Sequence, residues 1–261
     1  MEFEALNPNL YAQVLDELEL IPSTKPYQIL FYGSRERGDF HPESDLNFYL
    51  VAHSTDQMKS QFIDSISRAL QKLEDVAPVN MIAGDADSLR HRIKISEPGS
   101  LQLMEASSVF YGEGLYEDLK AEWEKWKGRE IPKSDLIAYL EKRIRFFKQQ
   151  VTRNTKDEIS QLERITTLTL HIWALQNIHD LTHIELLKMD TPDQVAPLFS
   201  NLYRKEMEDS VWELLELQTR VRKLKVDIRW KREVSREDIH ETKYKLISLR
   251  NDEEFMMNLW A

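Results

Sequence analysis

Glycine is confined to one half of this chain. All seven glycines lie at or before Gly128, and after Pro132 only two further prolines interrupt the sequence. A long stretch without glycine, almost without proline and rich in Leu, Glu, Lys and Arg favours consecutive α-helices. The first half instead alternates short apolar runs with turn residues, which is typical of mixed α and β structure. We therefore predict an α+β protein, with a mixed domain over residues 1–130 and an all-α helical bundle over residues 131–261.

The net charge of -10 is confined to the same half. Residues 131–261 contain 22 basic and 22 acidic residues, which leaves 13 basic and 23 acidic residues for 1–130. An acidic surface repels the backbone of a nucleic acid, whose binding normally requires many Lys and Arg contacts. We expect a phosphate ligand of the first half to be small, and we expect no nucleic-acid polymer as a partner.

Composition also bounds the location of the protein. The chain has no Cys, which excludes disulfides and thiolate metal sites. No window approaches the roughly 18 consecutive apolar residues that a membrane span needs. The acidic first ten residues lack the basic and apolar regions of a secretory signal. We expect a cytoplasmic, bacterial protein with no membrane partner.

Periodicity and turn residues predict the elements of both halves. In the first half we expect strands at 27–32, 46–52, 79–83 (closed by Gly84) and near 109–111, and helices at 11–20, 56–73 and around 89–93. In the second half we expect helices at 134–151, 157–177, 182–189, 205–229 and 235–259. Ser134 and Asp135 are capping candidates for the first of these, and Thr182 with Glu185 forms a capping box for the third.

The segment that follows the first strand carries residues suited to a phosphate. Gly33 and Ser34 stand at the end of the strand, where glycine lets backbone N–H groups approach phosphate oxygens closely. Arg35 and Arg37 add positive charge to an otherwise acidic half, and Ser44 lies at the end of the turn. We predict that these five residues bind a nucleotide.

The second strand begins with residues suited to a cation. Asp45 and Asn47 are two residues apart, so their side chains share one face of the strand and point back toward the Gly33-Ser34 turn. Two oxygen-bearing side chains at this spacing can hold a hard cation between the protein and phosphates. On the third strand, Asn80 follows Val79, and Leu89-Arg90 lies in the next helix.

This order of residues resembles the signature of the DNA polymerase β-like nucleotidyltransferase superfamily. That signature is a strand, Gly-Ser, a turn of about ten residues, Asp-x-Asp on a second strand and a third carboxylate early in a third strand. The match covers residues 27–112 and is similar to the minimal bacterial nucleotidyltransferases. The second half resembles the helical substrate-binding domains of the kanamycin-type enzymes and the HEPN bundles. The resemblance implies a nucleoside triphosphate as partner and Mg²⁺ as cofactor.

Two of the three carboxylates that the resemblance implies are replaced by asparagine. In active family members the three carboxylates hold two Mg²⁺ ions, which clamp the triphosphate and activate the attacking hydroxyl. Here only Asp45 matches, because Asn47 and Asn80 stand at the other two positions. Each lost carboxylate forfeits on the order of 4 kcal/mol of attraction per unit of cation charge at about 4 Å and a dielectric of about 20. We expect weak Mg²⁺ binding at Asp45, weak or no transfer, and a nucleotide-binding or regulatory role.

Two other functions remain open from the sequence. An active antibiotic-type nucleotidyltransferase would transfer a nucleoside monophosphate to a hydroxyl of an acceptor that the sequence does not identify, and its base would come from the candidates Glu141, Glu158 and Glu163. A HEPN or antitoxin-like interaction protein would use its helices as an oligomer interface. Arg164 and His171 are seven residues apart on one predicted helix, about the spacing of the Arg and His of HEPN ribonucleases, but we favour a partly buried helix face for them.

The remaining clusters have structural interpretations. We expect a turn between His179 and His183 rather than one helix through both, because the Thr182 capping box would start a new helix there. We take the basic run at 220–229 as a solvated helix face, with a triphosphate as the alternative partner. Asp85 and Asp87 follow Gly84 and are expected beyond the third strand, as loop acids. Five tryptophans are expected to pack at the interdomain contact or at a homodimer interface: Trp123, Trp126, Trp212, Trp230 and Trp260.

Overall fold

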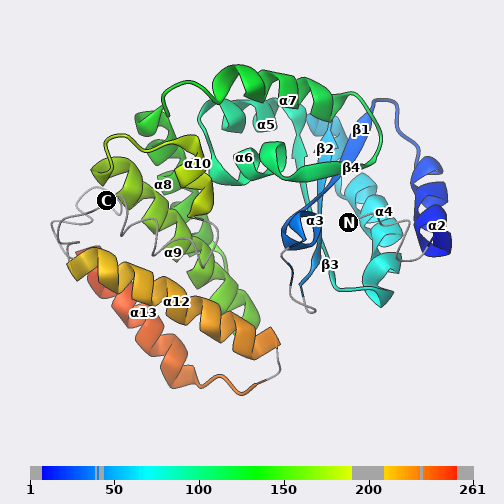
Figure 1. Cartoon of the computed structure of the whole chain (residues 1–261). Helices are drawn as coiled ribbons and strands as arrows, with labels where there is room; N and C mark the ends of the chain where they lie inside the picture. Colours follow the sequence, from blue (N-terminus) through cyan, green and yellow to red (C-terminus); the bar gives the residue numbers. More distant parts are fainter. Residues whose placement is uncertain (1–7, 39, 41–43, 190–208, 230–231, 252–261) are drawn as a thin grey trace. The chain divides into compact units, whose positions relative to one another are not determined.

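The computed structural model describes residues 8–38, 40, 44–189, 209–229 and 232–251. Contacts between Cα atoms divide the chain into two compact units, unit 1 (Met1–Arg129) and unit 2 (Glu130–Ala261). The predicted mixture of α and β structure is confirmed (Figure 1). Among the described helices, none combines the length and the apolar character needed to cross a bilayer.

Unit 1 contains all four strands of the described chain. They are β1 (Tyr27–Tyr32), β2 (Leu46–Ala52), β3 (Val79–Asp85) and β4 (Ser107–Tyr111). The helices of unit 1 are α2 (Pro8–Glu19), the single turn α3 (Ser34–Arg37), α4 (Ser60–Gln71), α5 (Ala86–Lys94), α6 (Pro98–Glu105) and α7 (Leu115–Trp126). Two 3₁₀ turns, η1 (Thr55–Met58) and η2 (Lys72–Asp75), flank α4.

The strands form one mixed sheet in the order β3-β2-β1-β4. β1 pairs antiparallel with β2 and with β4, whereas β2 and β3 are parallel and are joined through α4. The register places Asn47 of β2 opposite Tyr32 of β1 and opposite Asn80 of β3. The ends of three strands therefore meet beside Gly33, which follows Tyr32.

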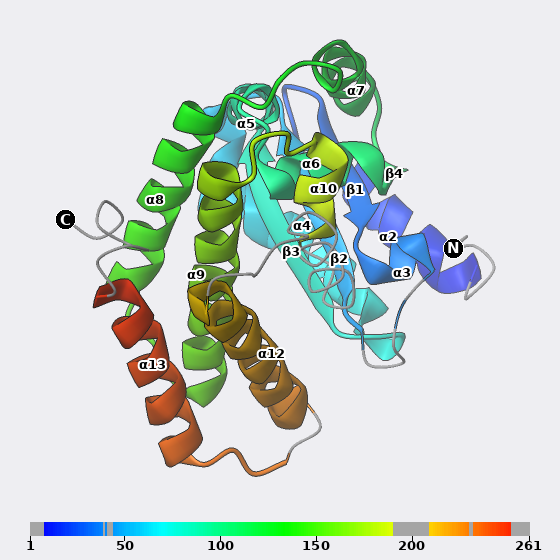
Figure 2. The same cartoon turned by 60° about the vertical axis from the view of Figure 1, so that its left-hand side comes forward.

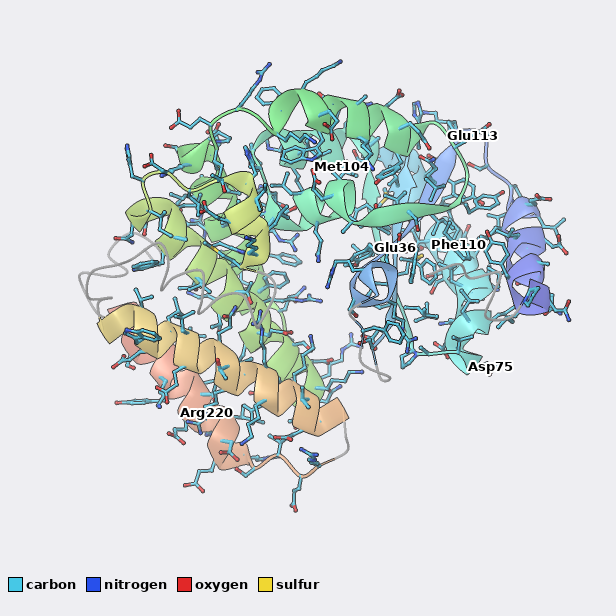
Figure 3. The ribbon with its side chains drawn as sticks, in the orientation of Figure 1. Glu36, Asp75, Met104, Phe110, Glu113 and Arg220 are labelled. Atoms are coloured by element: carbon cyan, nitrogen blue, oxygen red, sulfur yellow. The ribbon has the colours of Figure 1, made fainter. Side chains whose placement is uncertain are left out.

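Different helices cover the two faces of the sheet. Ile29, Phe31, Phe48 and Leu50 point to the face that α2 and α4 cover, and they form the core of unit 1 with Val14. Phe110 of β4 joins this core, since its ring lies 5.0 Å from that of Phe48 between centroids (Figure 3). The helices α5, α6 and α7 lie on the opposite side of the sheet (Figures 1 and 2).

α7 is attached to the second face of the sheet through the buried polar side chain of Gln28. The side chain of Gln28, which is fully buried in β1, accepts a hydrogen bond from the backbone N–H of Tyr116 and donates to a carboxylate oxygen of Glu117 at 3.1 Å. Both partners lie in the first turn of α7. These bonds fix the start of α7 against β1.

The regular elements in the described part of unit 2 are helices. They are α8 (Lys133–Gln149), α9 (Thr155–Asn177), α10 (His183–Lys188), α12 (Asp209–Arg229) and α13 (Arg236–Asn251). α9 packs against α8 and α12, and α12 packs against α13 (Figure 2). A single core of Leu, Ile, Val, Phe and Trp side chains joins them. Parts of the predicted helices 205–229 and 235–259 lie outside the described residues, as do Trp230 and Trp260.

Two sequence predictions are wrong in detail, and two helices were not predicted. Ser134 and Asp135 do not cap α8, because the helix begins at Lys133 and the N-cap is Pro132. β3 does not close at Gly84 but continues to Asp85, which is the N-cap of α5 and accepts a hydrogen bond from the Ser88 amide. The sequence left residues 98–105 and 115–126 unassigned, and they form α6, which Glu97 caps from its N-terminal side, and α7.

Candidate functional site

Two asparagine side chains meet where the family signature expects two carboxylates. The amide Nδ2 of Asn80 donates to Oδ1 of Asn47 at 3.1 Å. The Asn47 amide Nδ2 in turn donates to the backbone oxygen of Asp45 at 3.3 Å. Since parallel pairing sets Asn47 directly opposite Asn80, the contact follows from the register of β2 and β3.

Gly33 borders this asparagine pair. Its backbone has φ 93°, a conformation that side-chain-bearing residues rarely adopt. A Cβ atom built on Gly33 would lie 3.1 Å from Nδ2 of Asn47. The absence of a side chain thus keeps the strand end open next to the two amides.

The other predicted nucleotide-binding residues lie on or near α3. Ser34 is the first residue of α3 and Arg37, which is exposed, is the last. Arg35 is only 6% exposed, and its Nε donates to the backbone oxygen of Ser44 at 2.5 Å. Its guanidinium also lies 4.9 Å from the ring centroid of Phe40. Arg35 therefore holds the connection between α3 and β2 in place.

Asp45 is half-buried and immediately precedes β2. Its backbone oxygen contacts Asn47, as described above, and its side chain is on the same alternating face of the chain as Asn47. Asp45 is the one carboxylate among the three positions that the resemblance assigns to metal.

A tyrosine and an arginine continue this face of the sheet. Tyr49 follows Asn47 by two residues and is 3% exposed. Arg92 of α5 donates from its guanidinium to the Tyr49 hydroxyl. Burial raises the pKa of Tyr49, while Arg92 acts in the opposite direction. Gly84 of β3 passes so close to this hydroxyl that a Cβ would overlap it. This pair was not predicted from the sequence, although alternation along β2 already places Tyr49 on the face of Asn47.

Asp85 is the last residue of β3, directly after Gly84, and its side chain caps α5. Its carboxylate accepts from the backbone N–H of Ser88 at 2.9 Å and from the Ser88 hydroxyl at 2.7 Å. Burial raises the pKa of Asp85, but these hydrogen bonds outweigh it and leave the pKa below its ordinary value. Asp85 is therefore committed to capping α5.

The donor set around Asn47 does not fit a pair of magnesium ions. Each magnesium ion takes an octahedral shell of oxygen ligands, usually one or two carboxylates with waters and substrate phosphates. Here one carboxylate, Asp45, accompanies two neutral amides, and one lone pair of the Asn47 oxygen is occupied by the N–H of Asn80. In an amide–amide contact one partner must present N–H groups rather than oxygen, whichever way each amide is turned. A cation at this position would face a hydrogen-bond donor.

Two of the three acidic candidates of unit 2 form ion pairs with lysines. Glu158 accepts from Lys243 of α13, and Glu163 accepts from Lys225 of α12 at 2.6 Å. These pairs link α9 to α13 and α12. Glu141 lies on α8 and is half-buried.

Arg164 and His171 lie in different environments. Arg164 is exposed, whereas His171 is 2% exposed within the core-facing part of α9. The structure does not bring them together on an accessible surface. Because His171 is buried, it is not positioned to reach a substrate from solvent.

The turn predicted between His179 and His183 is present, but the basic run is not simply a solvated face, because Arg220 and Lys225 are half-buried and pair with carboxylates of other helices. His179 lies in the turn after α9, while His183 is the first residue of α10 and follows the confirmed Thr182–Glu185 capping box. In the basic run, Arg220 binds Glu241 at 2.6 Å and Asp238 at 3.4 Å, both on α13 (Figure 3). Trp123 is buried, Trp126 is half-buried, and Trp212 is 48% exposed.

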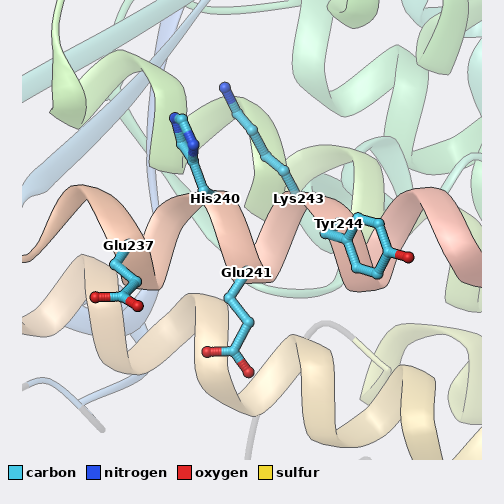
Figure 4. A pocket seen from close by; sticks show the side chains of 5 residues that line it. All are labelled: Glu237, His240, Glu241, Lys243 and Tyr244. Carbon is cyan, nitrogen blue, oxygen red and sulfur yellow. The ribbon is translucent and has the colours of Figure 1, made fainter.

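A shallow depression of about 590 Å³ lies on α13. It is lined by Glu237, His240, Glu241, Lys243 and Tyr244. Figure 4 shows that the two carboxylates point to one side of the helix, while His240 and Lys243 point to the other. The side chains do not converge on one ligand.

A scan against protein-family models found none that matches the chain, and a search of curated proteins found no match.

Proposed function

We propose that this chain is a nucleotidyltransferase-like protein that binds a nucleoside triphosphate but has lost efficient transfer. The observation that carries the proposal is the hydrogen bond from Asn80 to Asn47 beside Gly33. This hydrogen bond lies where the resemblance implies a metal site, but its two neutral amides disfavour metal binding.

The position is supported by three strand ends. A strand that ends at Gly33-Ser34, a second strand that carries Asp45 and Asn47, and a parallel third strand with Asn80 opposite Asn47 occur in the order of the family signature. The backbone conformation of Gly33 leaves room for a ligand to approach. Arg37 and the N–H groups of the turn supply donors for phosphate oxygens.

The chemistry at this position is neutral. Phosphoryl or nucleotidyl transfer depends on positive charge that stabilises the developing charge on phosphate oxygens. Two asparagines that are hydrogen-bonded to one another supply neither a charged ligand for Mg²⁺ nor a base for the incoming hydroxyl. Binding without turnover is the outcome that these residues favour, in a sensing or regulatory role.

Titration calorimetry with ATP and GTP, with and without MgCl₂, tests the proposal. We expect binding that is weak and almost independent of Mg²⁺, because the protein contributes little to holding the ion. Arg37→Gln should weaken nucleotide binding. Arg68→Gln, which removes one exposed charge from α4, is the charge-matched control and should leave binding unchanged.

Two results would reject the proposal. Tight, strictly Mg²⁺-dependent binding, accompanied by release of pyrophosphate with an acceptor, would show a working transferase. No binding of either nucleotide at millimolar concentration would remove the nucleotide site altogether.

A further inference from the structure

A strongly basic segment lies at the junction of α8 and α9 in unit 2. Residues 142–156 contain six basic residues and no acidic residue, with Glu141 and Asp157 as the nearest acids in sequence. The segment covers the last two turns of α8, the connection and the start of α9. The total charge hides this segment, because the basic and acidic residues of 131–261 balance.

Most of these basic groups have no acidic partner. Among the residues that the structure describes, no carboxylate forms an ion pair with Lys142, Arg143, Arg145, Arg153 or Lys156. All five are exposed. Elsewhere in unit 2, by contrast, Arg220, Lys225 and Lys243 are each bound by carboxylates.

Two arginines from different helices meet at one aromatic ring. The guanidinium carbons of Arg143 on α8 and Arg164 on α9 lie 4.9 Å and 5.1 Å from the ring centroid of Phe147. The Phe147 ring is itself 4% exposed, so it offers a fixed support. A guanidinium that stacks on a ring keeps its N–H donors in its own plane and available to an anion.

The surroundings of Arg164 preserve this positive charge. Its neighbours three and four residues away along α9 are uncharged: Ser160, Gln161, Thr167 and Leu168. Arg164 also forms no ion pair among the described residues. The two guanidiniums are therefore placed to bind phosphate groups.

An exposed aromatic ring adjoins the arginines. Phe146 is 53% exposed, and its ring centroid lies 5.6 Å from that of Phe147 at an interplanar angle of 64°. An exposed phenylalanine surrounded by arginines is a suitable surface for stacking an unpaired base. The polar side chain of Gln149, one turn further along α8, is also exposed.

We propose that this surface, formed by Lys142, Arg143, Phe146 and Arg164, binds single-stranded nucleic acid. The arginines contact consecutive phosphates and Phe146 stacks on a base. This inference is independent of the nucleotide site in unit 1. It also revises the expectation of no nucleic-acid partner, which followed from net charges summed over each half of the chain.

A lipid surface fits the same residues less well. Insertion into a bilayer requires adjoining apolar side chains, but the neighbours of Phe146 on the outer face of α8 are Lys142 and Gln149. The connection to α9 adds one exposed apolar side chain, Val151, among polar side chains whose burial in hydrocarbon is unfavourable. A duplex leaves no unpaired base for Phe146, so a single strand is favoured.

Fluorescence anisotropy of the full chain with labelled oligouridine of about 12 nucleotides tests the proposal. We expect binding that weakens with salt. The double variant Arg143→Gln/Arg164→Gln should lower the slope of log K against log salt by about 0.7 for each lost phosphate contact. Phe146→Leu, which keeps an apolar side chain but removes the ring, should weaken binding about fivefold or more at every salt concentration.

Lys188→Gln/Arg236→Gln is the matched control, since it removes two exposed charges of unit 2 outside this surface. It should leave binding within twofold of the parent chain. An equal loss in the control would show unspecific charge attraction and overturn the proposal, as would no binding by the parent chain. Equal binding of a duplex, or stronger binding to phosphatidylserine vesicles that Phe146→Leu abolishes, would also overturn it.

Discussion

Replacement of Asn47 and Asn80 by aspartate tests the contact on which the nucleotide site depends. Each single variant places one carboxylate next to an amide, which still donates to it. The double variant places two carboxylates where Nδ2 and Oδ1 now lie 3.1 Å apart. The two negative charges then repel, and no proton holds them together at neutral pH.

The size of this repulsion follows from the distance and the exposure. Two unit charges about 4 Å apart interact by roughly 4 kcal/mol at an effective dielectric of about 20, and by about 1 kcal/mol in bulk water. Asn80 is exposed and Asn47 is half-buried, so solvent screens the pair strongly. We expect each single variant to change the free energy of unfolding by less than about 1 kcal/mol, and the double variant to lose about 1–2 kcal/mol more than the two singles together.

Urea unfolding of the parent chain, both single variants and the double variant measures this coupling as a double-mutant cycle. The experiment is performed at pH 7 in EDTA and repeated with MgCl₂. Together with Asp45, the two new aspartates supply three carboxylates, so Mg²⁺ should reduce the repulsion in the double variant. The parent chain should respond little to Mg²⁺.

Additive effects, within about 0.5 kcal/mol, would refute the contact between positions 47 and 80. A coupling energy that MgCl₂ leaves unchanged would refute the expectation that Mg²⁺ reduces the repulsion in the double variant. It would show that the two carboxylates approach one another but cannot hold the ion with Asp45.

Three further predictions concern single features of the fold. Asp85→Ala should lower the free energy of unfolding by about 1 kcal/mol at pH 7 through loss of the α5 cap. Because the pKa of Asp85 is lowered in the folded chain, this stabilisation is complete above the ordinary pKa of 3.8 and is lost as the pH falls through the pKa of the folded chain. Urea unfolding should therefore show a difference between parent and variant at pH 7 that disappears at pH 2.5. Gly84→Ala should destabilise by about 1–3 kcal/mol because its Cβ overlaps the Tyr49 hydroxyl, and Tyr49→Phe should recover part of this loss in thermal unfolding; no recovery would contradict that cause. Thr182→Ala should cost about 1 kcal/mol through loss of the α10 capping box, while Thr182→Ser should be nearly neutral in the same denaturant titration.

The sequence identified most elements because their signals are local. The strands 27–32 and 46–52 were predicted with the bounds of β1 and β2, since each is a short apolar run between turn residues. α6 was missed because Pro98 and Gly99 at its start suggest a turn, whereas Pro at the first helical position is well tolerated. The Ser134 and Asp135 caps were wrong because cap-forming residues are also frequent within the first turn.

The candidate site was only partly accessible to sequence reasoning. Alternation along β2 sets Asp45 and Asn47 on one face, and the spacing of the third strand suggested Asn80. That Asn80 bonds to Asn47 depends on the parallel register of two strands separated by α4, which no local pattern specifies. The pairing of Arg92 with Tyr49 is of the same kind.

The sequence by itself predicted a mixed first half and helices in the second half, because glycine, proline and charge act on the chain locally; all strands among the described residues lie in unit 1. Only the tertiary structure decided which polar side chains are engaged. Glu158 and Glu163 bind lysines of other helices, His171 is buried, and Arg143 and Arg164 share one ring. Such partners lie far apart along the chain, and packing brings them together.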